Sequence, residues 1–175
     1  MQTSEKYPSS RVALHWLMLL LLIAVYTVID LRDYFPKESS AREGLKTWHF
    51  MLGLSVLVLV VIRLLLRWMR PGPALLQGPA WQTWLAKATH LLLYVFMIGM
   101  PLAGWLILST AGKPIPFFGF ELPALMGQDK NLSDQIKNLH EVVATIGYFL
   151  LGLHALGALF HHYVIKDNTL RRMWV

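Results

Sequence analysis

Histidine is the residue type whose placement in this sequence most clearly indicates chemistry. The chain has seven histidines, all within or beside long apolar stretches: His15, His49, His90, His140, His154, His161 and His162. An ionisable side chain inside an apolar span is costly to desolvate, so each is a functional candidate by default. Imidazole can bind a metal or carry a proton near neutral pH. The competing interpretation, a histidine that lies among lipid headgroups without a role, fits best for His90, His161 and His162.

Two of these histidines share one face of a single predicted helix. His140 and His154 are about four helical turns apart, which separates them by about 21 Å along the axis. That spacing would supply one ligand to each of two stacked haems. Ala144, Gly147 and Ala158 lie on the same face and would leave room for flat porphyrins. Packing between membrane helices also uses small residues, but it does not explain the histidines.

Depth in the bilayer indicates which histidines of the other helices lie level with each of these two. His49 opens the second apolar stretch and comes level with His140. His15 and His90 both come level with His154. The sequence therefore predicts two histidine pairs, one near each membrane face, and spacing alone does not decide between His15 and His90.

The available ligands narrow the type of metal group. The chain has no cysteine, which excludes covalent c-type haem, iron–sulfur clusters and thiolate zinc sites. Paired histidines could bind zinc or copper, but a zinc ion would require further ligands and only Glu141 is near. Two imidazoles on opposite sides of a haem leave no open position on the iron. This arrangement predicts electron transfer and not oxygen binding.

The elements that must position the histidines are apolar enough to cross a membrane. Apolar residue types make up 55% of the 175 residues, charged types 15%, and the mean hydropathy is +0.48, a balance far more apolar than that of a soluble domain. We predict one all-α membrane domain over residues 1–175, a four-transmembrane-helix up-down bundle that binds two b haems. Its helices are expected at about 12–29, 48–66, 88–112 and 134–165, with Ser133 as the N-cap of the fourth.

Basic residues indicate which side of the membrane each end faces. With the N-terminus in the cytoplasm, the cytoplasmic side holds nine of the 16 basic residues, namely Lys6, Arg11, Arg63, Arg67, Arg70, Lys87, Lys166, Arg171 and Arg172. Several of these cluster at helix ends. We therefore predict a multi-pass protein of the bacterial cell inner membrane with both termini in the cytoplasm, surrounded by membrane lipid and without a nucleic-acid partner.

Motifs along the whole chain resemble those of the bacterial cytochrome b561 family, which is related to the cytochrome b subunits of membrane hydrogenases and formate dehydrogenases. The first three helices carry His15-Trp16, Trp48-His49, Arg63 with Arg67, and His90 with Tyr94, Pro101 and Gly104. The most specific part is the run Leu139-His140-Glu141, Gly147-Tyr148, Leu153-His154, His161-His162-Tyr163, Asp167-Asn168 and Leu170-Arg171-Arg172-Met173.

The resemblance implies which histidines bind haem and what the electron acceptor is. It implies haem ligation by His15 with His154 and by His49 with His140, which leaves His90 without an assigned role. It also implies ubiquinone, from the quinone pool, as the membrane electron partner. A member of the family is a superoxide oxidase, so the leading expectation is an oxidoreductase that takes electrons from superoxide on the periplasmic side and reduces ubiquinone.

Two other functions remain open from the sequence. The chain could be a non-catalytic electron conduit or membrane anchor for a partner dehydrogenase or hydrogenase, and a partner protein is possible but not required. It could also be a histidine-based carrier of metal or haem. Reaction with superoxide without any partner protein would favour the first function over the conduit, and haem that stays low-spin and exchanges electrons with quinol would exclude the carrier.

Two further pairs of residues are candidates for the substrate sites. Lys46 and Lys137 each lie three residues before a predicted ligand, so both should flank the outer haem and attract anionic superoxide. Arg42 is expected to add to them. Alternatively, the two lysines only pair with haem propionates or lipid phosphates. His161 and His162 are assigned to the quinone and proton end, because quinone reduction consumes protons and histidine titrates near neutral pH.

Overall fold

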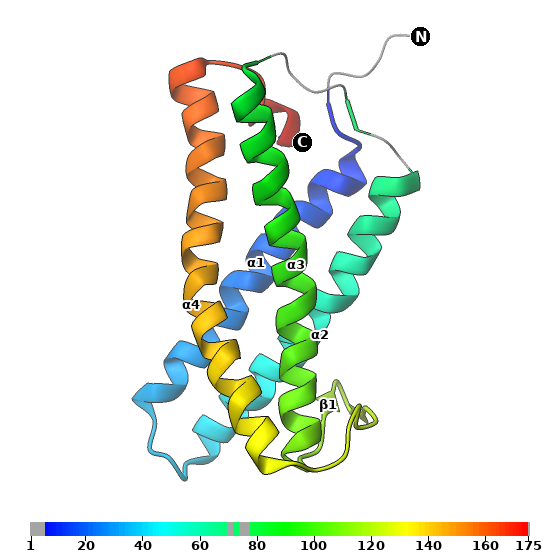
Figure 1. Cartoon of the computed structure of the whole chain (residues 1–175), viewed down its shortest axis with the longest axis vertical. Coiled ribbons are helices and arrows are strands. Elements are labelled where there is room, and N and C mark those ends of the chain that lie inside the picture. The colour runs from blue at the N-terminus through cyan, green and yellow to red at the C-terminus, as the bar shows by residue number, and fades with distance from the viewer. Residues whose placement is uncertain (1–5, 70–71, 74–77, 175) are drawn as a thin grey trace.

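Four long helices make up most of the protein (Figure 1). A computed structural model describes residues 6–69, 72–73 and 78–174. The helices are α1 (Ser9–Leu31), α2 (Ser40–Met69), α3 (Ala80–Thr110) and α4 (Lys130–Phe160). The spans that contain them have mean hydropathies of 1.9 to 2.4 and are long enough to cross a bilayer. The chain is a multi-pass membrane protein, as the sequence predicts.

The helices run alternately up and down, and each packs against the next along the chain. A short 3₁₀ turn, η1 (Arg32–Tyr34), begins the link from α1 to α2. The link from α3 to α4 contains a small antiparallel hairpin of β1 (Pro116–Phe117) and β2 (Phe120–Glu121). The first and last described residues lie at the end of the bundle opposite this hairpin (Figure 1). We call these the terminal end and the hairpin end.

Several helices extend beyond the predicted apolar stretches. α2 begins at Ser40 and α3 at Ala80, about two turns before the apolar residues start. Polar residues do not end a helix, whereas proline tends to mark its start, and Pro8 and Pro79 stand directly before α1 and α3. Arg70, one of the basic residues assigned to the cytoplasmic side, lies outside the described residues.

The predicted N-cap of the fourth helix is wrong. The N-cap is Asp129, whose carboxylate accepts a hydrogen bond from the Leu132 backbone N–H at 3.0 Å. Ser133 lies inside the helix, where its hydroxyl donates to the Ile107 carbonyl of α3 at 3.1 Å. A carboxylate one turn earlier can cap the helix equally well. Ser133 instead connects the first turn of α4 to α3.

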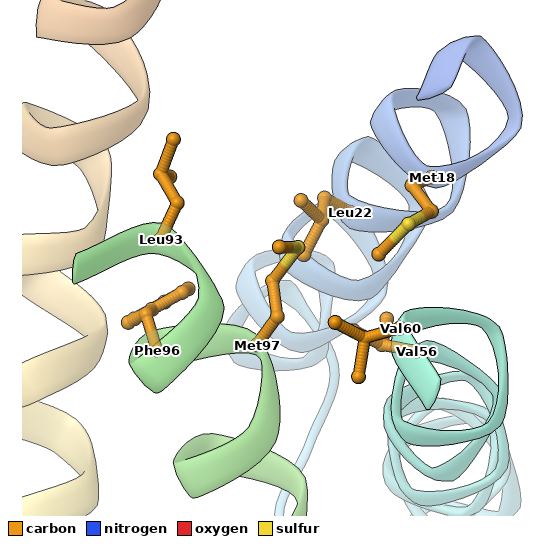
Figure 2. Packing of buried hydrophobic residues seen from close by; sticks show 7 residues of the cluster. All are labelled: Met18, Leu22, Val56, Val60, Leu93, Phe96 and Met97. Atoms are coloured by element: carbon orange, nitrogen blue, oxygen red, sulfur yellow. The ribbon is translucent and has the colours of Figure 1, made fainter. Parts of the chain in front are cut away.

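The buried core lies among α1, α2 and α3. It consists of Met18, Leu22, Val56, Val60, Leu93, Phe96 and Met97 (Figure 2). In the apolar stretch of any span, at most 22% of the residues are buried inside the protein, and the share is only 6% in the span that contains α4. Most apolar side chains therefore face outward, as expected for a protein surrounded by lipid. In α4 only Ser133 and Gly147 are buried among the described residues.

Candidate functional site

At the hairpin end, His49 of α2 and His140 of α4 lie next to each other. Their ring centroids are 6.4 Å apart. The His49 Nδ1 lies 3.1 Å from the Val25 carbonyl of α1. Because a carbonyl only accepts, Nδ1 carries the proton and Nε2 is left with its lone pair, the arrangement usual for a metal-binding histidine. The His140 Nδ1 is buried and has no hydrogen-bond partner among the described residues. We call these two residues the histidine pair.

Nearer the terminal end, His15, His90 and His154 form a second group, the three-histidine cluster. The His15 and His154 ring centroids are 6.0 Å apart, and those of His90 and His154 are 5.5 Å apart. The structure thus brings together every histidine that the sequence matches by depth. Both His15 and His90 contact His154, so proximity alone does not decide between them.

Basic side chains of α2 adjoin the three-histidine cluster. Arg63 donates from Nη1 to the His15 Nδ1 at 3.0 Å. The Arg67 guanidinium lies over the Tyr94 ring, 5.6 Å from its centroid, and both arginines act electrostatically on the Tyr94 hydroxyl. Arginine cannot accept a hydrogen bond, so the His15 Nδ1 is the acceptor. This environment differs from that of His49, whose Nδ1 faces a carbonyl.

On α4, between His140 and His154, contacts to α1 form a layer of polar and aromatic side chains. The Tyr26 hydroxyl donates to the Ala144 carbonyl at 2.8 Å, and the Tyr148 hydroxyl donates to the Asp30 carboxylate at 2.7 Å. The two tyrosine rings lie 4.2 Å apart between centroids. Sequence reasoning missed this layer, although a carboxylate directly after an apolar stretch is a signal for an internal partner.

Gly147 does not leave the open space that its small size suggests. A Cβ at this position would meet the Tyr26 hydroxyl and the Phe96 ring. Side chains of α1 and α3 therefore occupy the surface of α4 at this point. The small residue allows close helix packing, which is the alternative that the sequence left open.

Both candidate lysines at the hairpin end have carboxylate partners on their own helices. The Lys46 Nζ lies 2.6 Å from the Glu43 Oε1, and the Lys137 Nζ lies 3.7 Å from the Glu141 Oε1. Arg42 donates to the Arg32 and Phe35 carbonyls and pairs with Asp33, so it holds the turn after α1. Neighbouring carboxylates reduce the positive field that these side chains present to an anion.

The last turns of the fourth span hold His161 and His162. The helix widens into a π-helical segment, η2 (His161–Ile165), which ends at Lys166 in the left-handed conformation with φ of 60°. That turn brings Asp167 back to His161, whose Nδ1 donates to the carboxylate at 2.6 Å. His162 lines a cavity of about 270 Å³ together with Tyr163, Lys166, Asp167 and Arg171. π-helical segments occur frequently at functional sites.

The Asp167 carboxylate is stabilised in its charged form. Partial burial raises the pKa of Asp167, but hydrogen bonds from Thr169 and His161 outweigh that effect and hold the pKa below its ordinary value. The ionised carboxylate can only accept, so it keeps the proton of neutral His161 on Nδ1 and leaves Nε2 with a lone pair. The sequence does not indicate this contact, because it depends on the conformation of Lys166.

Comparison with known proteins decides the family. Residues 6–175 match the family described as Prokaryotic cytochrome b561. The chain belongs to this family. Cytochrome b561 homolog 1 of Escherichia coli (strain K12) is 37% identical over 97% of both chains. Probable superoxide oxidase CybB of Yersinia pestis is 38% identical over 97% of this chain and 96% of its own length. Cytochrome b561 homolog 2 of Escherichia coli (strain K12) is 32% identical over 98% of this chain and 92% of its own length.

Membership in the cytochrome b561 family implies haem b, and the histidine geometry fits that group. An imidazole nitrogen binds a metal at about 2 Å, so two imidazoles on opposite sides of one iron have ring centroids about 6 Å apart. The separations of 6.4 Å for His49 and His140 and 6.0 Å for His15 and His154 are close to this value, whereas 5.5 Å for His90 and His154 is shorter. The buried His140 Nδ1 has no hydrogen-bond partner among the described residues. This is expected for a ring whose orientation would be set by a bound group.

The same geometry is less suited to a bare metal ion. Among the described residues, no three or more His, Cys, Asp or Glu side chains are arranged to hold one. The cytochrome b561 family and the four membrane spans together make this chain a haem-dependent membrane electron-transfer protein.

Proposed function

We propose that this cytochrome b561 oxidises superoxide at the hairpin end and reduces ubiquinone near the terminal end. The observation that carries the proposal is the pair of histidine groups at two levels of one four-helix bundle. The relative named probable superoxide oxidase, at 38% identity, supports superoxide as the donor. With more basic residues at the terminal end, this end faces the cytoplasm of a bacterium and the hairpin end faces the periplasm.

The four ligands come from three helices. His49 and His140 would hold one haem b, and His15 and His154 the other, with α4 contributing one ligand to each. When bound, a haem with two imidazole ligands supplies one-electron transfer without an open iron position. His15 is chosen over His90 because its separation from His154 is nearer to that of two imidazoles across one iron.

The overall reaction balances electrons and protons. Two superoxide anions lose one electron each and leave as dioxygen. Two electrons and two protons convert one ubiquinone to ubiquinol. His161 and His162 handle the protons, because they lie beyond the three-histidine cluster on the same helix, and Asp167 holds the His161 ring so that Nε2 can exchange a proton.

Lys46 and Lys137 guide superoxide to the histidine pair. Each lies about one helical turn from a haem ligand, and both have an exposed carboxylate partner rather than a buried one. An exposed ion pair contributes little stability and exchanges readily. The lysines therefore keep the freedom to attract a small anion at low ionic strength.

The test combines haem content with the reaction itself. The purified protein with its haems is mixed with enzymatically generated superoxide, with and without a soluble ubiquinone analogue, and haem reduction and quinol formation are recorded by absorption. We expect haem reduction by superoxide alone and quinol formation when the quinone is added. A protein that reacts only when a dehydrogenase or hydrogenase partner is supplied would refute the proposal in favour of the conduit function.

Four single substitutions test the ligands. His140→Ala and His154→Ala should each lose one of two haems in a pyridine haemochrome assay. His90→Ala is the matched control, and it should keep both haems with unchanged spectra. Loss of a haem in His90→Ala together with full retention in His15→Ala would show that His90, and not His15, pairs with His154.

A further inference from the structure

The two histidine groups lie in different electrostatic surroundings. The Arg63 guanidinium is half-buried and contacts His15 directly, at 3.0 Å. Its charge also acts on His90 and His154. Arg67 acts on His90 as well. Among the described residues, no acidic group interacts with any member of the three-histidine cluster. The cluster therefore lies in a positive potential.

The histidine pair lacks such a field. His49 interacts with two charges of opposite sign, Arg32 and Asp30, whose effects on the ring oppose each other. Among the described residues, the titratable side chain that acts on His140 is His49, which is neutral. The Val25 carbonyl oxygen lies 3.1 Å from the His49 Nδ1. A carbonyl in this position increases the electron donation of the ligand.

Both differences widen the gap between the reduction potentials of the two haems, and they do so in the same direction. Oxidised haem iron carries one more positive charge than reduced iron, so a nearby cation destabilises the oxidised form and raises the potential. The effect is large where the dielectric constant is low, as between membrane helices. It requires only that the guanidinium stays near, so it persists if haem binding turns the His15 ring. A more strongly donating ligand at the histidine pair lowers the potential there.

We infer that Arg63, assisted by Arg67, raises the reduction potential of the haem at the three-histidine cluster above that of the haem at the histidine pair. Arg63 is then a positioning residue that acts through the field at His15 and His154. An electron that enters at the hairpin end passes downhill to the terminal end. The inference rests on the proposed haem ligation, but it does not depend on superoxide or ubiquinone being the natural substrates.

The experiment is a potentiometric titration of the protein with its haems bound, in detergent, with redox mediators and without superoxide or quinone. The His140→Ala background isolates the haem at the three-histidine cluster. In that background Arg63→Gln should lower the affinity of this haem for an electron about tenfold, equivalent to a shift of about 59 mV for one electron. Arg63→Lys keeps the charge and should stay close to the parent value.

Lys87→Gln is the matched control. It removes one positive charge from the same end of the bundle, but Lys87 is exposed on α3 and should leave the potential unchanged. An unchanged potential in Arg63→Gln would overturn the inference, and so would an equal shift in Lys87→Gln. If Arg63→Gln fails to retain this haem, Arg67→Gln is titrated instead. A smaller fall in the reduction potential supports the inference, and an unchanged potential rejects it. A His140→Ala protein with both haems would instead reject the ligand assignment.

Discussion

The Gly147→Ala substitution tests how closely α4 packs against α1 and α3. A Cβ at this position would lie 2.5 Å from the Phe96 Cζ and 2.7 Å from its Cε2, whereas carbon atoms in favourable contact are about 3.5 to 4.0 Å apart. It would also meet the Tyr26 hydroxyl, which donates to the Ala144 carbonyl. Either α4 or both aromatic side chains must move to admit one methyl group.

The magnitude follows from three effects. Overpacking of a close contact costs about 1 to 3 kcal/mol, and disturbing the Tyr26 hydrogen bond costs about 1 kcal/mol more. Alanine recovers about 1 kcal/mol over glycine through its helix propensity. The net destabilisation is about 1 to 3 kcal/mol, which at about 2 to 4 °C per kcal/mol lowers the melting temperature by about 2 to 12 °C.

The assay is thermal unfolding in detergent, followed by the intrinsic fluorescence of the tryptophans. Gly152→Ala is the matched control, because it lies on the same helix and a Cβ there would have no neighbour within 4 Å. We expect the control to melt at or slightly above the wild-type temperature. A Gly147→Ala protein that is as stable as the control, with its haems bound, would refute the packing described at this position.

Three further outcomes follow from the site. A Lys46→Glu, Lys137→Glu double variant should react more slowly with superoxide, and the fall in rate with ionic strength seen in the wild type should flatten or reverse, because attraction between exposed charges is screened over about 8 to 10 Å at ordinary salt. His161→Ala and His162→Ala should slow quinone reduction severalfold in stopped-flow traces and leave both haem spectra intact. Asp167→Asn should lower the melting temperature at neutral pH, because a carboxylate with a lowered pKa contributes stability above its ordinary pKa of 3.8, and the difference from wild type should vanish as the pH falls through the lower folded value.

Each of these outcomes has a contrary result. Equal rates and equal salt slopes, with haem content preserved, would reject steering by the two lysines. Unchanged quinone kinetics in both histidine variants would remove them from the quinone end. A stability difference between Asp167→Asn and wild type that is constant from pH 7 to pH 3 would show that the hydrogen bonds to Thr169 and His161 do not depend on the charge of Asp167.

Local pattern explains why so much of the fold could be predicted. Membrane spans follow from apolar composition alone, since lipid requires about 20 apolar residues for each crossing helix. The shared face of His140 and His154 follows from the helical repeat. Even the pairing of Lys46 with Glu43 and of Lys137 with Glu141 could have been predicted, because residues three or four apart on a helix are neighbours.

Helix ends were harder to place, because a cap depends on one hydrogen bond. Asp129 and Ser133 are both residue types that suit an N-cap, and the sequence does not indicate which of them caps the fourth helix. Packing against α3 decides it, because the Ser133 hydroxyl donates a hydrogen bond to the Ile107 carbonyl of that helix. The link from α2 to α3 includes residues outside those the structure describes.

The sequence by itself determined the four spans, the two levels of histidines and the family. The tertiary structure decided which side chains surround them. Arg63 reaches His15, and Tyr26 fills the space beside Gly147, across helices that lie far apart in the chain. Asp167 reaches His161 only because Lys166 adopts a left-handed conformation. Such contacts depend on how helices cross and turn, and helical periodicity carries no information about the residue on the facing helix.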